Sequence, residues 1–112
     1  MEYVLHLRER PFQSIKNKTK TIEMRLFDEK RQQYQVGDIL IFEHNDTLER
    51  IYTKIIALHR YNHFEDLYNK FDKVSLGYNE DETASASDML DYYPIEEQNK
   101  FGVLGIEIKV LE

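Results

Sequence analysis

Three side chains in the first quarter of the chain, Lys20, Glu23 and Arg25, are of types that suit an anionic ligand. Lys20 offers a compact charge for a phosphate, and Arg25 offers a planar fork that fits a phosphate or a base edge. Glu23 could accept a hydrogen bond from a base amine or position the Arg25 fork. A structural interpretation stands beside this one, because alternating Lys and Glu on a strand is often a solvated face with cross-strand ion pairs.

These residues lie in a basic stretch of an acidic chain. The 112 residues carry a formal net charge of −6, which taken alone argues against a nucleic-acid partner. Residues 8–31, however, hold eight basic residues against four acidic ones, whereas residues 63–100 hold ten acids against three bases. Such asymmetry predicts a polarised surface whose basic face meets an anion, although two solvated faces would give the same pattern.

Further residues complete the expected ligand-binding set. Lys16, Lys18 and Thr21 lie beside Lys20 in the basic stretch. Tyr34, Tyr61 and Tyr78 are candidate stacking surfaces for an unpaired base. Tyrosines are also common core residues that keep a wet hydroxyl, so this assignment has a structural alternative as well.

Several classes of chemistry receive no support. The chain has no cysteine, which removes disulfides and thiolate chemistry. The four histidines form no recognisable ligand set, so we expect no metal site. No phosphate-loop, serine-elbow or metal-hydrolase motif occurs, and no cofactor is implied. No segment has the length and apolarity of a membrane span or a secretion signal, so we expect a cytoplasmic protein with no membrane partner.

The elements that must position these residues follow an α+β order in one domain spanning residues 1–112. Alternation and β-branched composition predict strands at residues 3–8, 19–26, 39–43, 48–61 and 101–111, the third and fourth forming a hairpin. Helical spacing predicts a short helix after Pro11 and an amphipathic helix over residues 63–73. Ser85 or Ser87 should cap a helix after an exposed loop, and Pro94 should begin another.

These strands suggest a small, mainly antiparallel β-barrel of five or six strands that closes its own edges, with short flanking helices. The first, third, fourth and last strands should pair with one another. Much of the single core should come from Leu5, Ile39, Ile41, Ile55, Val103, Ile106 and Ile108.

The ordered motifs resemble the ASCH domain family, in its small bacterial single-domain form. Residues 12–15 followed by 18–25 are similar to the family's short helix, loop and strand of the form Gly-x-Lys-x-x-x-x-Arg, with Lys20 and Arg25 at that spacing. Gly37-Asp38 before an apolar strand is similar to a second family feature, and Tyr93-Pro94 with residues 101–106 to its closing segment. Lys18 departs from the pattern because it stands at the signature glycine, and we expect Asn17 to supply the left-handed residue instead.

The resemblance implies a PUA-like β-barrel with a cleft near the signature loop that faces RNA or a nucleotide-like ligand. It also implies an alternative, because one bacterial branch of the family is an amidohydrolase that deacetylates N4-acetylcytidine. That branch uses a Lys, a Thr three residues on and a later Glu. Lys20 matches the Lys, but Glu23 stands in place of the Thr, and the later Glu has no secure match. Lys20 and Glu23 are the expected catalytic pair only if the chain is an enzyme.

Overall fold

The computed structural model describes residues 1–112 and contains five strands with short helices between them. The strands are β1 (Glu2–Leu7), β2 (Ile22–Leu26), β3 (Ile39–His44), β4 (Arg50–Tyr61) and β5 (Val103–Val110). The α-helices are α1 (Glu9–Lys16), α2 (Phe64–Tyr68) and α3 (Ile95–Phe101), and the 3-10 helices are η1 (Arg31–Gln33) and η2 (Ala86–Asp91). The expected α+β class is therefore confirmed.

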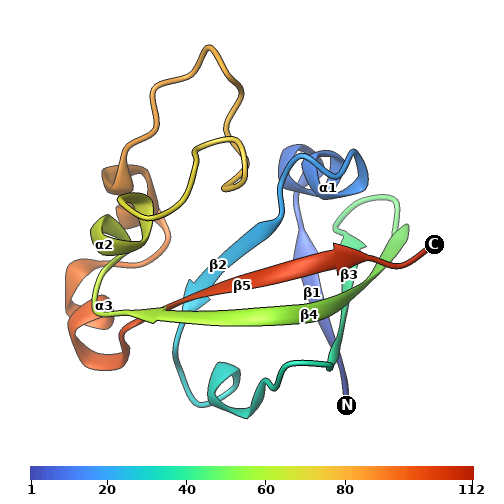
Figure 1. The fold of residues 1–112 in the computed structure, drawn as a ribbon, viewed down its shortest axis with the longest axis horizontal. Helices are drawn as coiled ribbons and strands as arrows, with labels where there is room; N and C mark the ends of the chain where they lie inside the picture. The colour runs from blue at the N-terminus through green and yellow to red at the C-terminus, as the bar shows by residue number, and fades with distance from the viewer.

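All five strands form one mixed sheet in the order β1-β3-β4-β5-β2. β1 runs parallel to β3, and the other neighbours are antiparallel, including the expected hairpin of β3 and β4. The sheet curls so that β1 and β3 lie behind β4, β5 and β2 (Figure 1). β1 and β2 end the sheet and are not hydrogen-bonded to each other, so the PUA-like fold is a half-barrel and the expected closure of its edges is wrong.

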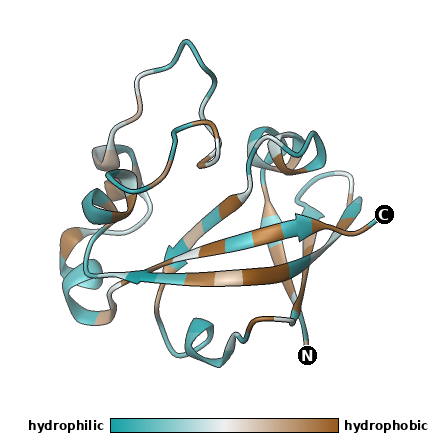
Figure 2. Cartoon of the chain, in the orientation of Figure 1, coloured by the Kyte–Doolittle hydropathy of each residue, from teal (hydrophilic) through white to brown (hydrophobic).

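The sheet has an apolar cluster on each of its two faces, where the sequence predicted one core. The inner cluster fills the half-barrel and is covered at one end by Phe12 and Ile15 of α1. The outer cluster joins the β2 side chains Ile22, Met24 and Leu26 to α2 and the segment after it. Hydrophobic and hydrophilic residues alternate along a strand where one of its sides faces a cluster (Figure 2). Of the seven predicted core residues, only Ile39 is not buried.

Three helical predictions differ in outcome. Ser85 caps η2 by accepting a hydrogen bond from the Ser87 N–H, and α3 begins directly after Pro94, as expected. The predicted helix over residues 63–73 is too long, because α2 ends at Tyr68. Asp72 accepts a hydrogen bond from the Val74 N–H, and such local side-chain bonds favour a turn over a continued helix.

Candidate functional site

Lys20, Glu23 and Arg25 form one buried ionic cluster. The Nζ atom of Lys20 lies 3.0 Å from Oε1 of Glu23, and Nη2 of Arg25 lies 3.0 Å from Oε2 of the same carboxylate. Oε1 also accepts a hydrogen bond from the Met24 N–H at 3.1 Å. The side chains of Lys20 and Glu23 are only 9% and 4% exposed. The carboxylate is therefore enclosed by donors on both oxygens, and it fixes both cations.

This environment keeps Glu23 ionised. Burial alone would raise the pKa of Glu23, but the charges of Lys20 and Arg25 and their hydrogen bonds outweigh it and lower this pKa to about 2. A carboxylate with so low a pKa is a poor general base near neutral pH. Glu23 consequently acts as a fixed anion that positions Lys20 and Arg25.

The register of β2 places Glu23 and Arg25 on the inner face of the sheet, the face that carries the inner apolar cluster. Glu23 and Arg25 pair with Ile106 and Leu104 of β5, which both belong to the inner cluster, so the two charged side chains lie on that face. Lys20 reaches the cluster from the loop before β2 and packs against Gly77. Gly77 has φ +109°, a conformation that residues with a side chain rarely adopt, and a Cβ atom there would lie only 3.1 Å from Lys20 Cδ, so both the backbone and the close approach favour glycine.

A cleft of about 460 Å³ opens over this cluster, along the seam between β2 and the β1–α1 junction. Its two walls come from distant parts of the chain. The residues that line it are His6, Leu7, Arg8, Arg10, Pro11, Lys20, Glu23, Met24, Arg25, Asn45, Met89, Tyr92 and Tyr93. We call it the seam cleft. The structure thus brings the three signature side chains into one concavity that also contains two further arginines and two tyrosines.

The other predicted basic residues lie outside the seam cleft. Lys16 forms an ion pair with Glu49 at 2.7 Å, and Lys18 is paired with Glu112. Thr21 lines a separate, smaller cleft together with Lys18 and Lys20. The prediction that Asn17 supplies a left-handed residue is wrong: Asn17 has φ −77°, whereas Lys18 itself has φ +67°. The residue at the signature-glycine position therefore keeps the glycine-like conformation.

The three predicted stacking tyrosines also lie elsewhere. Tyr34 is buried, at 7% exposure, and Tyr61 lines a different cavity at the far end of β4. The Tyr78 hydroxyl is hydrogen-bonded to Tyr68 and to Asp88, and burial together with these bonds raises the pKa of Tyr78. None of the three lines the seam cleft.

The seam cleft is lined instead by Tyr92 and Tyr93, together with Arg8, for which the sequence predicted no specific role. The guanidinium of Arg8 lies 5.1 Å from the centre of the Tyr92 ring and donates a hydrogen bond to its hydroxyl at 3.4 Å. Burial raises the pKa of Tyr93, and the Arg25 charge opposes that rise. The sequence held a partial signal for these residues, because Arg8 lies in the basic stretch and Tyr93 in the closing motif. It did not indicate that Arg8 and Tyr92 are in contact, because 84 residues separate them.

The arrangement does not reproduce the hydrolase set. Glu23 occupies the position of the nucleophilic Thr and is fixed between two cations. Thr21, the nearest hydroxyl in sequence, does not line the seam cleft. Of the loop glutamates, Glu82 is held by an ion pair with Arg10 and by the Asn79 N–H. The donor set can bind and orient an anion, but it presents no activated hydroxyl.

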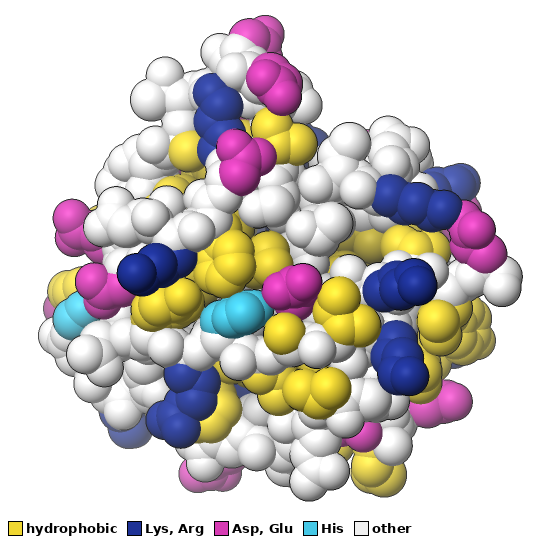
Figure 3. Space-filling view, in the orientation of Figure 1, with side chains coloured by type: hydrophobic (Ala, Val, Ile, Leu, Met, Phe, Trp, Pro, Cys, Tyr) yellow, Lys and Arg dark blue, Asp and Glu magenta, His cyan; other side chains and the backbone are white.

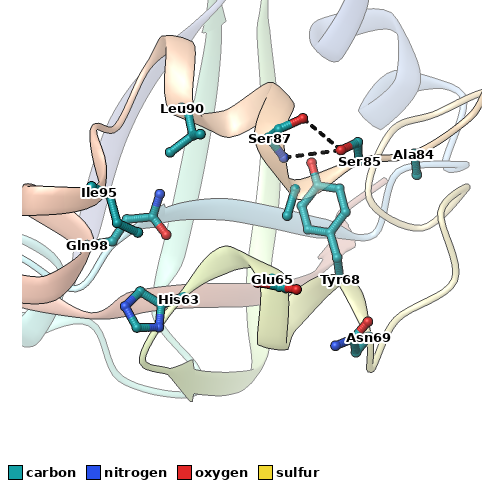
Figure 4. A pocket seen from close by; sticks show the side chains of 11 residues that line it. His63, Glu65, Tyr68, Asn69, Ala84, Ser85, Ser87, Leu90, Ile95 and Gln98 are labelled. Carbon is teal, nitrogen blue, oxygen red and sulfur yellow. Dashed lines mark hydrogen bonds between the residues drawn. The ribbon is translucent and has the colours of Figure 1, made fainter.

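A larger cavity, of about 640 Å³, lies between α2, η2 and α3 (Figure 4). Several of its polar groups already form hydrogen bonds within the protein. Gln98 accepts a hydrogen bond from the Phe64 N–H and donates one to the Tyr93 carbonyl, and His63 is hydrogen-bonded to Asn99. Its charged lining residue, Glu65, is acidic and exposed. This cavity is the larger of the two, but charged side chains converge only in the seam cleft. We therefore place the candidate functional site in the seam cleft.

The fold and the seam cleft define a small α+β half-barrel domain of PUA-like type. The chain belongs to the ASCH domain family, whose model matches residues 5–112. This confirms the resemblance carried by the sequence motifs.

Two solved Pyrococcus structures are similar over essentially the whole chain. The crystal structure of hypothetical protein PH0355 is 29% identical, with a TM-score of 0.79, and the match covers 99% of this chain and 100% of that one. The solution NMR structure of protein PF0455 from Pyrococcus furiosus is 32% identical, with a TM-score of 0.72 and coverage of 100% and 99%. No curated protein matches this chain. The structure contains no helix long and apolar enough to span a membrane.

Proposed function

We propose that this chain is an RNA- or nucleotide-binding ASCH domain whose ligand lies in the seam cleft. The observation that carries the proposal is the convergence of Lys20, Arg25, Arg8 and Arg10 on one concavity in a chain of net charge −6. Basic side chains gathered in an acidic protein indicate an anionic ligand, and arginine forks suit phosphates and base edges. Membership of the ASCH family supports the same class of ligand.

The aromatic side chains give the ligand a second feature besides phosphate. Tyr92 is 54% exposed, and its ring lies at the rim of the cleft beside Arg8. An exposed tyrosine next to a guanidinium can stack an unpaired base, whereas the bases of an intact duplex are not available to it. The proposed ligand is therefore single-stranded RNA or a nucleotide rather than a duplex.

Fluorescence anisotropy with a labelled single-stranded RNA octamer, together with calorimetry on cytidine monophosphate, tests the proposal. Affinity should fall as salt is added, because binding displaces counterions. Arg8→Gln and Arg10→Gln are the informative variants, since both residues are exposed and their replacement leaves the buried Glu23 paired. Each should weaken binding and reduce the salt slope by about 0.7 for each phosphate that is no longer neutralised.

Lys54→Gln is the matched control. Lys54 is an exposed lysine on β4 that does not line the seam cleft. Figure 3 shows the face of β4 and β5, where basic side chains also occur. The variant should leave affinity and slope unchanged. Equal losses from Lys54→Gln and Arg8→Gln would mean diffuse charge attraction, and absence of binding to either ligand would overturn the proposal.

A further inference from the structure

The open seam continues beyond Arg25 into a second concavity. This cleft has a volume of about 340 Å³, and we call it the seam-end cleft. His6 and Arg25 line both it and the seam cleft, so the two are continuous along the seam. Besides these two residues, its lining includes Tyr3, Lys30, Arg31 and Tyr34.

The charges of the seam-end cleft are predominantly basic and incompletely paired. Arg31 contacts the Asp28 carboxylate through Nη1, at 3.3 and 3.4 Å, while its buried Nε has no hydrogen-bond partner. The Arg31 side chain is 13% exposed, and buried polar atoms are ordinarily satisfied. Lys30, next to it, is exposed and has no ion-pair partner in the structure. No carboxylate lines this cleft.

An aromatic wall accompanies these cations. The rings of Tyr3 and Tyr34 lie 4.7 Å apart between centroids at an interplanar angle of 45°. Tyr34 is buried, and its ring packs against the half-buried ring of Tyr3. Burial raises the pKa of the Tyr34 hydroxyl, against the opposing charges of Arg31 and Arg25. Aromatic surface beside several basic groups is the composition that single-stranded nucleic acids require.

We propose that the seam-end cleft binds a second, adjacent nucleotide of an RNA strand whose first nucleotide lies in the seam cleft. The phosphate between the two nucleotides lies near Arg25, and Lys30 and Arg31 hold the next phosphate. Tyr3 contacts the second base. This inference rests on the proposed function of the seam cleft, and it specifies an oligonucleotide rather than a free nucleoside or mononucleotide as the ligand.

The test compares ligand lengths on variants of the seam-end cleft alone. Cytidine monophosphate, the dinucleotide CpC and an octamer of cytidines are titrated against Lys30→Gln, Tyr3→Leu and the unchanged protein. Lys30→Gln should weaken octamer binding about fivefold and leave CpC unaffected, because CpC has no phosphate beyond the one between its nucleosides. Tyr3→Leu should weaken CpC and octamer binding about tenfold, while both variants leave monophosphate affinity unchanged. Arg10→Gln, which alters only the seam cleft, should weaken all three ligands.

Tyr52→Leu and Lys54→Gln are the matched controls, because both residues are exposed on β4 and line neither cleft. Both should bind like the unchanged protein, and thermal melting should show that every variant is folded. If the monophosphate binds but CpC and the octamer gain no affinity, or if the Lys30 and Tyr3 variants affect all lengths equally, the second subsite is overturned while the seam cleft stands. Failure of all ligands to bind overturns both proposals.

Discussion

The Nζ atom of Lys20 lies 3.0 Å from Oε1 of Glu23, and both side chains are less than one-tenth exposed. Arg25 approaches the other carboxylate oxygen at the same distance. One buried anion therefore holds two cations at the floor of the seam cleft. We expect stability to depend on this arrangement, and the proposed ligand binding to depend on it as well, and experiment can separate the two.

Removing the anion should destabilise the fold strongly. Glu23→Ala leaves Lys20 and Arg25 facing each other without a counterion, and breaking a buried pair in this way costs about 3–5 kcal/mol of unfolding free energy. Urea denaturation measures the loss. Glu107→Ala is the matched control, because Glu107 pairs with His59 at 35% side-chain exposure and should cost at most about 1 kcal/mol. Equal losses from the two variants would contradict the buried cluster.

The same cluster predicts how stability depends on pH. The pKa of Glu23 falls from 4.5 to about 2 on folding, so its ionised form stabilises the native state above pH 4.5. That contribution, about 3 kcal/mol, should be lost as the pH falls from 4.5 through 2. Urea unfolding of the unchanged protein and of Glu23→Gln isolates it. The difference between their unfolding free energies should be constant above pH 5 and shrink below pH 4. A difference that does not change with pH would contradict the lowered pKa of Glu23.

The conformation of Lys18 predicts opposite effects at two adjacent positions. Lys18 has φ +67°, a region that costs a residue with a Cβ roughly 1 kcal/mol, so Lys18→Gly should raise the melting temperature slightly. Its surface pair with Glu112 contributes little against this gain. Asn17→Gly, at φ −77°, only adds flexibility to the unfolded chain and should lower the melting temperature. Stabilisation by Asn17→Gly and not by Lys18→Gly would contradict the assigned conformations.

The hydrolase alternative predicts a product that binding alone does not. With Glu23 in place of the Thr, purified protein incubated with N4-acetylcytidine should form no cytidine above background. Chromatography of the reaction mixture measures this. Clear formation of cytidine that is lost in a folded Lys20→Ala variant would overturn the binding interpretation, and would mean that another group has replaced the absent hydroxyl.

Sequence patterns predicted the strands well because each strand has at least one side that faces apolar residues. They predicted two clusters as one core because alternation does not say which helices cover which face. Lys20, Glu23 and Arg25 could be grouped because they are close in sequence, with Glu23 and Arg25 on the edge strand β2 and Lys20 in the loop before it. Arg8 and Tyr92 could not be grouped, since their contact depends on how η2 folds back across the open seam. The same limit applies to Tyr34, Tyr61 and Tyr78, none of which lines the seam cleft.

Backbone amide NMR of labelled protein titrated with a short single-stranded RNA tests the central claim most directly, because it reports the location of binding as well as its existence. Chemical-shift changes should concentrate at Arg8, Arg10, Met24 and Tyr93 around the seam cleft. Changes concentrated instead at His63, Tyr68 and Gln98, around the larger cavity of α2, η2 and α3, would contradict the account.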